Sequence, residues 1–175
     1  MVDGSPARSH PPRVQDDTSD GSVHIAAATR RDASAIADLA TRFFLEEGFE
    51  LPPEGLGPRV ERYLETDGHA VFAAWRGGRP VAFATAAAGF GLEYGWVAEL
   101  EDLYVLPTER RKGIARRLID LVVGWAADRG CSAVLVTVTP VGERSHGLSA
   151  FYERLGFADR GRRLLERPVD ERPGG

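Results

Sequence analysis

The chain has 175 residues, and its 22 Lys plus Arg against 26 Asp plus Glu give a formal net charge of −4. This length fits one ordinary domain, and a hydrophobic fraction of 43% without an apolar run of about 18 residues predicts no membrane span. The single cysteine, Cys131, excludes an internal disulfide and a cysteine-based metal cluster, and the acidic balance argues against general nucleic-acid affinity.

The first 21 residues are rich in Pro, Ser, Asp and Gly and hold almost no large apolar side chain. Such a segment cannot offset the entropy of ordering, so we predict a disordered tail over 1–21, a folded domain over 22–167 and a flexible tail over 168–175. The N-terminal segment lacks the apolar core of a secretory signal, and a lone cysteine is typical of a reducing compartment. We therefore expect a cytoplasmic protein.

The folded part begins with alternating apolar residues over 23–27, which predict a first strand. Asp32 then stands where an N-cap belongs, and apolar residues at spacings of three and four predict a helix to about Glu47, ended by Gly48. Prolines and glycines interrupt residues 49–58, and we expect a second short helix after them.

Strands dominate the middle of the chain. The pattern predicts strands over 70–75, 81–88 and 96–106. The glycines at 77–78 can adopt the positive φ angles of a hairpin turn between the first two strands, and residues 89–95 are expected to form a loop between the last two.

The last third alternates helices and strands. We predict a helix from Ile114 to about Gly130, a strand over 133–139, a helix around 148–155 and a final strand over 157–165. This order favours an α/β fold with one mixed sheet covered on both faces, its hairpins antiparallel and its later βαβ step parallel.

The most specific feature is Arg-Arg-Lys-Gly-Ile-Ala at 110–115, between the end of a strand and the start of a helix. Backbone N–H groups at a helix N-terminus lack internal partners and lie at the positive end of the helix dipole, so an anion is stabilised there. Gly113 lets a ligand approach the backbone closely, and the basic side chains add attraction. The segment predicts a phosphate cradle; the alternative is a solvated basic helix start.

The pattern Arg-x-x-Gly-x-Ala at 110–115 resembles the acetyl-CoA pyrophosphate loop of the GNAT N-acetyltransferase family, (Gln/Arg)-x-x-Gly-x-(Gly/Ala). Leu-Glu-Asp-Leu-Tyr-Val at 100–105 is similar to the family's fourth strand, and Ala-Phe-Tyr-Glu-Arg-Leu-Gly-Phe at 150–157 is similar to its late helix. The resemblance implies the GNAT fold, with a central mixed sheet of six to seven strands and helices on both faces, and acetyl-CoA as the cofactor.

The resemblance also implies which residues hold coenzyme A. The pyrophosphate rests on the N–H groups of 111–115, and the thioester arm lies in a gap beside the fourth strand. Where the family often has Asn before the late helix, this chain has Ser145. The implied contacts are Leu103, Tyr104, Val105, Arg110, Arg111, Lys112, Gly113, Ile114, Ala115, Ser145 and Tyr152.

The general acid of the family is matched by Tyr152. A tyrosine hydroxyl with a pKa of about 10 is a sensible proton donor to a thiolate whose parent thiol has a pKa of about 8.5. The alternative for Tyr152 is an aromatic residue that packs under the helix.

Three acids, Glu99, Glu101 and Asp102, are candidates for the general base. Strand alternation puts Glu99 and Glu101 on one face and Asp102 on the other, and such crowding raises carboxylate pKa values. The alternative is an exposed strand end. The Leu-Glu-Asp segment is similar to that of polyamine and aminoglycoside acetyltransferases, which favours Glu101 as the base, with Asp102 second.

Acidic and aromatic residues mark the regions from which the family usually takes its substrate contacts, the first two helices and the loop before the fourth strand. Carboxylates attract ammonium groups and aromatic faces cover the rest of a cationic ligand; the alternative is ordinary surface solvation. The candidate substrate residues are Glu46, Glu47, Phe90, Glu93, Tyr94, Trp96 and Glu99.

These residues predict direct acetyl transfer to a primary amine, first of an aminoglycoside-type antibiotic, which would confer resistance, and otherwise of a polyamine or a protein N-terminus. The four histidines are scattered, so no metal site is indicated. Many family members are dimers, so the resemblance allows a homodimer. The non-catalytic alternatives are an acetyl-CoA sensor and a basic-helix interaction domain.

Overall fold

The computed structural model describes residues 22–167 and residue 169. The tail predicted over 1–21 and most of the tail predicted over 168–175 lie outside the described residues. The chain divides into two compact units, Met1–Val136 and Thr137–Gly175, and each is described by itself.

The first unit contains one mixed sheet, which confirms the predicted fold class. The strand order is β1-β2-β3-β4-β5, antiparallel from β1 to β4, with β5 parallel to β4 as the βαβ step predicts. Within the described residues the sheet has five strands rather than six or seven. Their bounds are β1 His24–Ala27, β2 His69–Arg76, β3 Arg79–Gly91, β4 Gly95–Val105 and β5 Val134–Val136.

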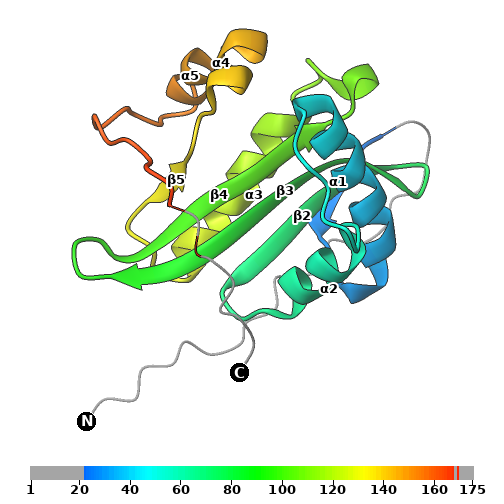
Figure 1. The fold of residues 1–175 in the computed structure, drawn as a ribbon, viewed down its shortest axis with the longest axis horizontal. Helices are drawn as coiled ribbons and strands as arrows, with labels where there is room; N and C mark the ends of the chain where they lie inside the picture. Colours follow the sequence, from blue (N-terminus) through cyan, green and yellow to red (C-terminus); the bar gives the residue numbers. More distant parts are fainter. Residues whose placement is uncertain (1–21, 168, 170–175) are drawn as a thin grey trace. The chain divides into compact units, whose positions relative to one another are not determined.

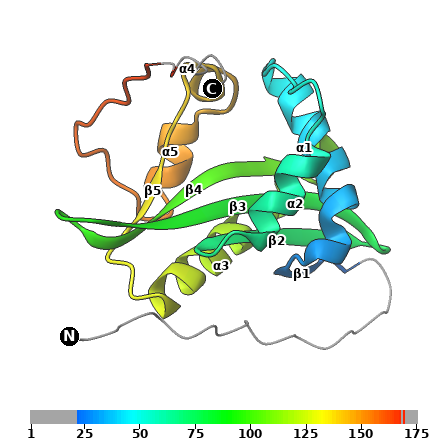
Figure 2. The ribbon, with the colours of Figure 1, turned by 60° about the horizontal axis from the view of Figure 1, so that its bottom comes forward.

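Helices cover both faces of this sheet, as Figures 1 and 2 show. The helices α1 (Ala33–Glu47) and α2 (Gly57–Glu65) lie on one face, and α3 (Ile114–Asp128) lies on the other. The centre of β3 is buried throughout residues 81–86, as expected for a strand covered on both sides. Among the described residues, no helix is long and apolar enough to cross a membrane.

The helix α1 shows how local sequence fixes an element. Ile36 and Leu39, at helical spacing, are 1% and 3% exposed and pack in the core with Phe83 of β3. The helix ends where Gly48 adopts the left-handed conformation with φ of 76° and donates its N–H to the carbonyl of Phe44. This end was expected at Gly48 because glycine enters that conformation without a steric penalty.

The sequence predicts the β2–β3 hairpin better than the β3–β4 hairpin. Gly77 and Gly78 have φ of 54° and 74° and form the predicted turn between β2 and β3. The expected loop over 89–95 is instead mostly strand, and only three residues separate β3 from β4. Glycines lower strand propensity, but the rings of Phe90 and Trp96 pair across the strands with centroids 5.6 Å apart and stabilise the ladder.

In the described part of the second unit there are two short helices, α4 (Pro140–His146) and α5 (Leu148–Glu153). The sequence predicts only the second. The signal for α4 is Thr139, whose side chain accepts the N–H of Gly142 at 3.0 Å, followed by proline at the first helical position.

The prediction of a final strand over 157–165 is wrong, because residues 157–167 form no strand. The Asp159 carboxylate accepts the N–H of Gly161 at 2.7 Å, and Gly161 has φ of 70°. This local turn competes with extended pairing. The strand predicted over 133–139 is also shorter than expected, at three residues.

Two glycine substitutions should shift stability in opposite directions. Gly48→Ala places a side chain in the left-handed region and should lower the free energy of unfolding by about 1 kcal/mol. Gly124→Ala, inside α3 where an added Cβ meets no atom within 4 Å, should raise it by about 0.5–1 kcal/mol. Urea unfolding followed by circular dichroism measures both; midpoints that move the same way would contradict the assigned conformations.

Candidate active site

An extra residue in β4 sets the geometry of the candidate site. Thr85 of β3 pairs with Asp102, whereas its neighbour Ala86 pairs with Leu100, so Glu101 has no partner in the register. Such a β-bulge disturbs the alternation of side chains because two residues oppose one. The strand therefore changes faces at Glu101.

The bulge overturns the prediction that Asp102 lies on the opposite face from Glu101. The Glu101 carboxylate accepts a hydrogen bond from the Tyr63 hydroxyl of α2, and Asp102 lines a pocket with residues of α1 and α2. The prediction is wrong because it assumes an unbroken strand. The two adjacent carboxylates thus both lie beside α2.

Glu101 is exposed and held by Tyr63, with 2.5 Å between the two oxygens. Burial, and then the hydrogen bond and charge of Glu101, raise the pKa of the Tyr63 hydroxyl well above its ordinary value, so the phenol stays protonated and donates. Tyr63 orients the Glu101 carboxylate. The sequence indicates Tyr63 only as part of a helix, and its role depends on a contact across 38 positions.

Asp102 is half-buried and forms two hydrogen bonds with Thr85. Its carboxylate accepts from the Thr85 hydroxyl at 2.8 Å, and its backbone N–H donates to the same oxygen at 3.0 Å. Burial raises the pKa of Asp102, the Thr85 hydrogen bond opposes this, and the charge of Glu101 adds to it. In the described part of the chain, no cationic side chain forms an ion pair with Asp102. Thr85 was missed, although it is the single polar residue of the predicted strand 81–88.

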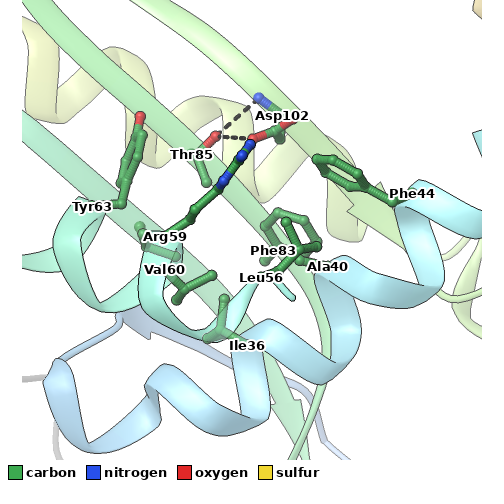
Figure 3. A pocket seen from close by; sticks show the side chains of 11 residues that line it. Ile36, Ala40, Phe44, Leu56, Arg59, Val60, Tyr63, Phe83, Thr85 and Asp102 are labelled. Carbon is green, nitrogen blue, oxygen red and sulfur yellow. Dashed lines mark hydrogen bonds between the residues drawn. The ribbon is translucent and has the colours of Figure 1, made fainter. Parts of the chain in front are cut away.

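A pocket of about 190 Å³ lies between α1, α2 and the sheet, with Asp102 in its wall (Figure 3). Most of the wall is apolar. Its polar side chains are Arg59, Tyr63, Thr85 and Asp102, and the apolar ones are Ile36, Ala40, Phe44, Leu56, Val60, Val71 and Phe83.

The strand β4 loses one neighbour near the same place. Its ladder with β5 ends at Leu100, and no other strand of the described residues pairs with that side of β4. Leu106 donates its N–H to β3, and N–H directions alternate along a strand. The N–H groups of Leu103 and Val105 therefore point to the open side, where the family resemblance expects the thioester arm.

The cradle begins after a 3₁₀ turn over Pro107–Glu109. Arg111 and Gly113 both adopt left-handed conformations, with φ of 62° and 77°, and a Cβ at Gly113 would meet no atom within 4 Å. The backbone at the N-terminus of α3 is thus open to a ligand. Its unpartnered N–H groups and the helix dipole fit the pyrophosphate of coenzyme A.

Two of the cradle's basic side chains form ion pairs with carboxylates of the protein. Arg110 donates its Nε–H to the carbonyl of Val105 at 2.9 Å, pairs with the Glu46 carboxylate, and lies 5.7 Å from the ring centroid of Tyr104. The Tyr104 hydroxyl donates to Glu46 at 2.8 Å, and its ring is buried. Glu46, a candidate substrate residue, and Tyr104, a candidate cofactor residue, therefore both contact the cradle's arginine.

Lys112 is bound through Glu109, whose carboxylate lies 3.2 Å from Lys112 Nζ and 3.0 Å from an amino nitrogen of Arg76. Burial raises the pKa of Glu109, but hydrogen bonds and charges from Lys112 and Arg76 outweigh it and leave the pKa below its ordinary value. Glu109 joins the cradle to the end of β2.

Most candidate substrate residues are not gathered at the carboxylates. From Asp102 to Trp96 is six residues along β4, or about 20 Å at 3.3 Å per residue, so the hairpin end is remote from the pocket. Glu99 is exposed on β4, two residues before Glu101. The remaining candidates are Glu47, at the end of α1, and Phe90, Glu93 and Tyr94, at the end of the β3–β4 hairpin.

Tyr152 and Ser145 belong to the second unit. Tyr152, in α5, is 6% exposed, with its ring 5.2 Å from that of Phe151 and 5.3 Å from that of Phe157. Burial raises the pKa of Tyr152 to about 12, so its hydroxyl is protonated at neutral pH. Ser145 is exposed in α4.

Residues 33–157 match the family model described as Acetyltransferase (GNAT) family. An aminoglycoside N(6')-acetyltransferase type 1 from Salmonella typhimurium is 30% identical over 111 residues, covering 61% of this chain and 74% of that protein. A protein of the same name from Serratia marcescens is 36% identical over 113 residues, covering 61% and 75%.

Solved structures share the fold. The aminoglycoside N-acetyltransferase AAC(6')-Iy, in complex with the bisubstrate analog CoA-S-monomethyl-acetylneamine, has a TM-score of 0.72 and 23% identity over 85% of this chain and 99% of its own. A ribosomal-protein-alanine N-acetyltransferase from Brucella melitensis has a TM-score of 0.70 and 24% identity, over 83% and 99%.

Asp102→Asn should stabilise the protein at neutral pH. The raised pKa of Asp102 means that the folded state disfavours its ionised form, so stability falls as the pH rises from the unfolded-state pKa through the folded-state pKa. Asn keeps an acceptor for Thr85 without the charge. We expect a higher Tm for Asp102→Asn than for the natural protein at pH 7, and this difference should shrink toward pH 4. Thermal unfolding at both pH values measures it, and equal shifts would contradict the ionisation argument.

Proposed function

The chain belongs to the acetyltransferase (GNAT) family, and we propose that its acceptor is a primary amine of a cationic small molecule, first an aminoglycoside-type antibiotic. The protein is an acetyl-CoA-dependent N-acetyltransferase. The observation that carries the cationic acceptor is the pair of carboxylates, Glu101 and Asp102, on one face of β4. The relatives named as aminoglycoside acetyltransferases support the antibiotic.

A polyamine is the second candidate acceptor. The segment 99–102 carries three carboxylates and no cation, and such a stretch attracts a ligand with several ammonium groups. The two acceptor classes differ in what a site must offer them. An aminoglycoside needs hydrogen-bond partners for its hydroxyl groups, whereas a polyamine has no hydroxyl groups.

The proposed cofactor contacts come from the backbone. The N–H groups at 111–115 would hold the pyrophosphate, and those of Leu103 and Val105 would face the thioester arm. Arg110 and Lys112 would act mainly by keeping the loop in place, because their charges are paired with Glu46 and Glu109. We propose Ser145 as a contact from the second unit on the family resemblance alone.

The proposed reaction is direct transfer. When bound, acetyl-CoA supplies the acetyl group as a thioester, whose C–S bond breaks and leaves its electron pair on sulfur as the C–N bond forms. Glu101 takes a proton from the ammonium, which frees the nitrogen lone pair for attack. A strand N–H stabilises the oxyanion. Tyr152 gives a proton to the sulfur and takes back the second proton that the nitrogen loses as the neutral amide forms. Asp102 holds the ammonium beside Glu101.

A thiol-release assay should find turnover with an aminoglycoside such as tobramycin. Glu101→Gln and Tyr152→Phe should each lower kcat by about 10²–10⁴-fold, the usual contribution of a general base or acid, with acetyl-CoA affinity by calorimetry almost unchanged. Glu99→Gln is the matched control on the same strand. If Glu99→Gln lowers kcat as much as Glu101→Gln, the assignment of Glu101 as the base fails. If no amine is acetylated, the proposed function fails.

Gly113→Glu should abolish measurable acetyl-CoA binding, because a new carboxylate at the cradle repels the pyrophosphate. Gly113→Gln has nearly the same shape and the same strain at φ of 77°, so it isolates the charge. We expect calorimetry to show a loss at least ten times larger for Glu than for Gln. Equal losses would mean that conformation, and not charge, governs this position.

A further inference from the structure

The apolar pocket is not needed for an acceptor that is mainly ammonium and hydroxyl groups. Seven of the eleven lining side chains are apolar, and such a wall offers hydroxyls no partners, which is costly. An aminoglycoside or a polyamine would use the carboxylates and leave the pocket itself unfilled.

The size of the pocket limits what can enter it. A dry cavity of about 150 Å³ lined by Leu, Ile and Phe binds benzene, and this pocket measures about 190 Å³. One aromatic ring, or a branched alkyl group of similar size, fits. The ring of Phe44 and the side chain of Val60, from opposing helices, are among the surfaces that it would contact.

The pocket also contains a place for an amine. The Asp102 side chain lines its wall, is half-buried, and forms no ion pair within the described residues. Tyr63 lines the same wall, and its hydroxyl bonds the neighbouring Glu101. The proposed base, Glu101, directly precedes Asp102 in the chain. An ammonium bound to Asp102 would therefore lie beside the residue next to the base.

Arg59 argues against a second ammonium inside the pocket. It is the cationic member of the lining, and its Nε lies 3.3 Å from the Glu54 carboxylate outside it. The Arg59 guanidinium would repel a second ammonium at the far end of a ligand, whereas it would not repel a neutral apolar group.

We propose that the enzyme has a further activity, the N-acetylation of primary amines that carry a single apolar group of about one ring, such as arylalkylamines. The ring fills the pocket between α1 and α2, and the ammonium binds Asp102. This activity rests on the proposed acetyl transfer and uses the same base.

The step is balanced as for any amine acceptor. The ammonium gives one proton to Glu101, the nitrogen lone pair forms the new C–N bond, and the C–S bond breaks with its electrons on sulfur, which takes a proton from Tyr152. The second proton that the nitrogen loses returns to the Tyr152 oxygen, and Glu101 releases its proton to water, so the products are the neutral N-acetyl amide, coenzyme A and one proton. The amide has no charge for Asp102 to hold, which favours product release.

Comparison of 2-phenylethylamine with ethylamine tests the pocket, because the two amines differ only by the ring. Burial of a phenyl group predicts at least a tenfold higher kcat/KM for 2-phenylethylamine. Val60→Phe, which fills the pocket, should reduce this ratio toward one. Val123→Phe is the matched control, since Val123 is exposed on α3 on the opposite face of the sheet, and it should leave the ratio unchanged.

The variants also separate this proposal from the proposed function. Val60→Ala, which enlarges the pocket, should shift the preference toward an amine with a larger ring system, tryptamine, and thermal unfolding should show that each variant is folded. The proposal that the pocket binds the ring is overturned by either of two results. One is a kcat/KM ratio of 2-phenylethylamine to ethylamine near one in the natural protein, and the other is an equal effect of Val60→Phe and Val123→Phe on that ratio. Tobramycin turnover with either result leaves the proposed function standing.

If no amine is acetylated, the proposed function fails, and calorimetry decides on the pocket. Binding of 2-phenylethylamine that is at least tenfold weaker in Val60→Phe than in Val123→Phe would retain it as a ligand site. Equal binding, or none, would overturn it.

Discussion

The bulge at Glu101 determines the chemistry of β4. Without it, alternation would turn Asp102 and Tyr104 to the face opposite Glu101. With it, Asp102 reaches the pocket and Tyr104 enters the core beneath α1. A bulge interrupts the hydrogen-bond ladder locally. Here the β3–β4 pairs on both sides of the bulge hold the bulged residue in place. One unpaired residue thus gives two carboxylates a common face.

The same change of face links the proposed acceptor side of the sheet to the cradle. Tyr104 donates to Glu46 at the end of α1, and Glu46 pairs with Arg110 at the start of the cradle. Removal of one partner of a half-buried pair leaves the other charge poorly solvated. The end of α1 and the loop that precedes α3 are therefore constrained together, although they are 64 positions apart in the chain.

Sequence predicted the elements with strong local signals. Gly48, the Gly77-Gly78 turn and the 110–115 motif define boundaries that the structure confirms, because each is set by its own backbone conformation. The bulge and the contacts of Tyr63 and Thr85 with the two carboxylates were not predicted. They depend on which residues of distant elements face one another. The final strand failed for a related reason: an Asp159–Gly161 turn outweighs a weak apolar pattern.

Charge pairing in the cradle explains why arginine is suited to position 110. Residues 110–117 carry five positive charges, and Glu46 and Glu109 pair with two of them. Arg110 contacts a carbonyl, a carboxylate and an aromatic face at once, which a planar guanidinium can do and a single ammonium cannot. The paired charges hold the loop, and in the proposed cofactor site the backbone N–H groups and the helix dipole would bind the anion. The opposite signs of the cradle and of segment 99–102 are thus compatible with a small net charge.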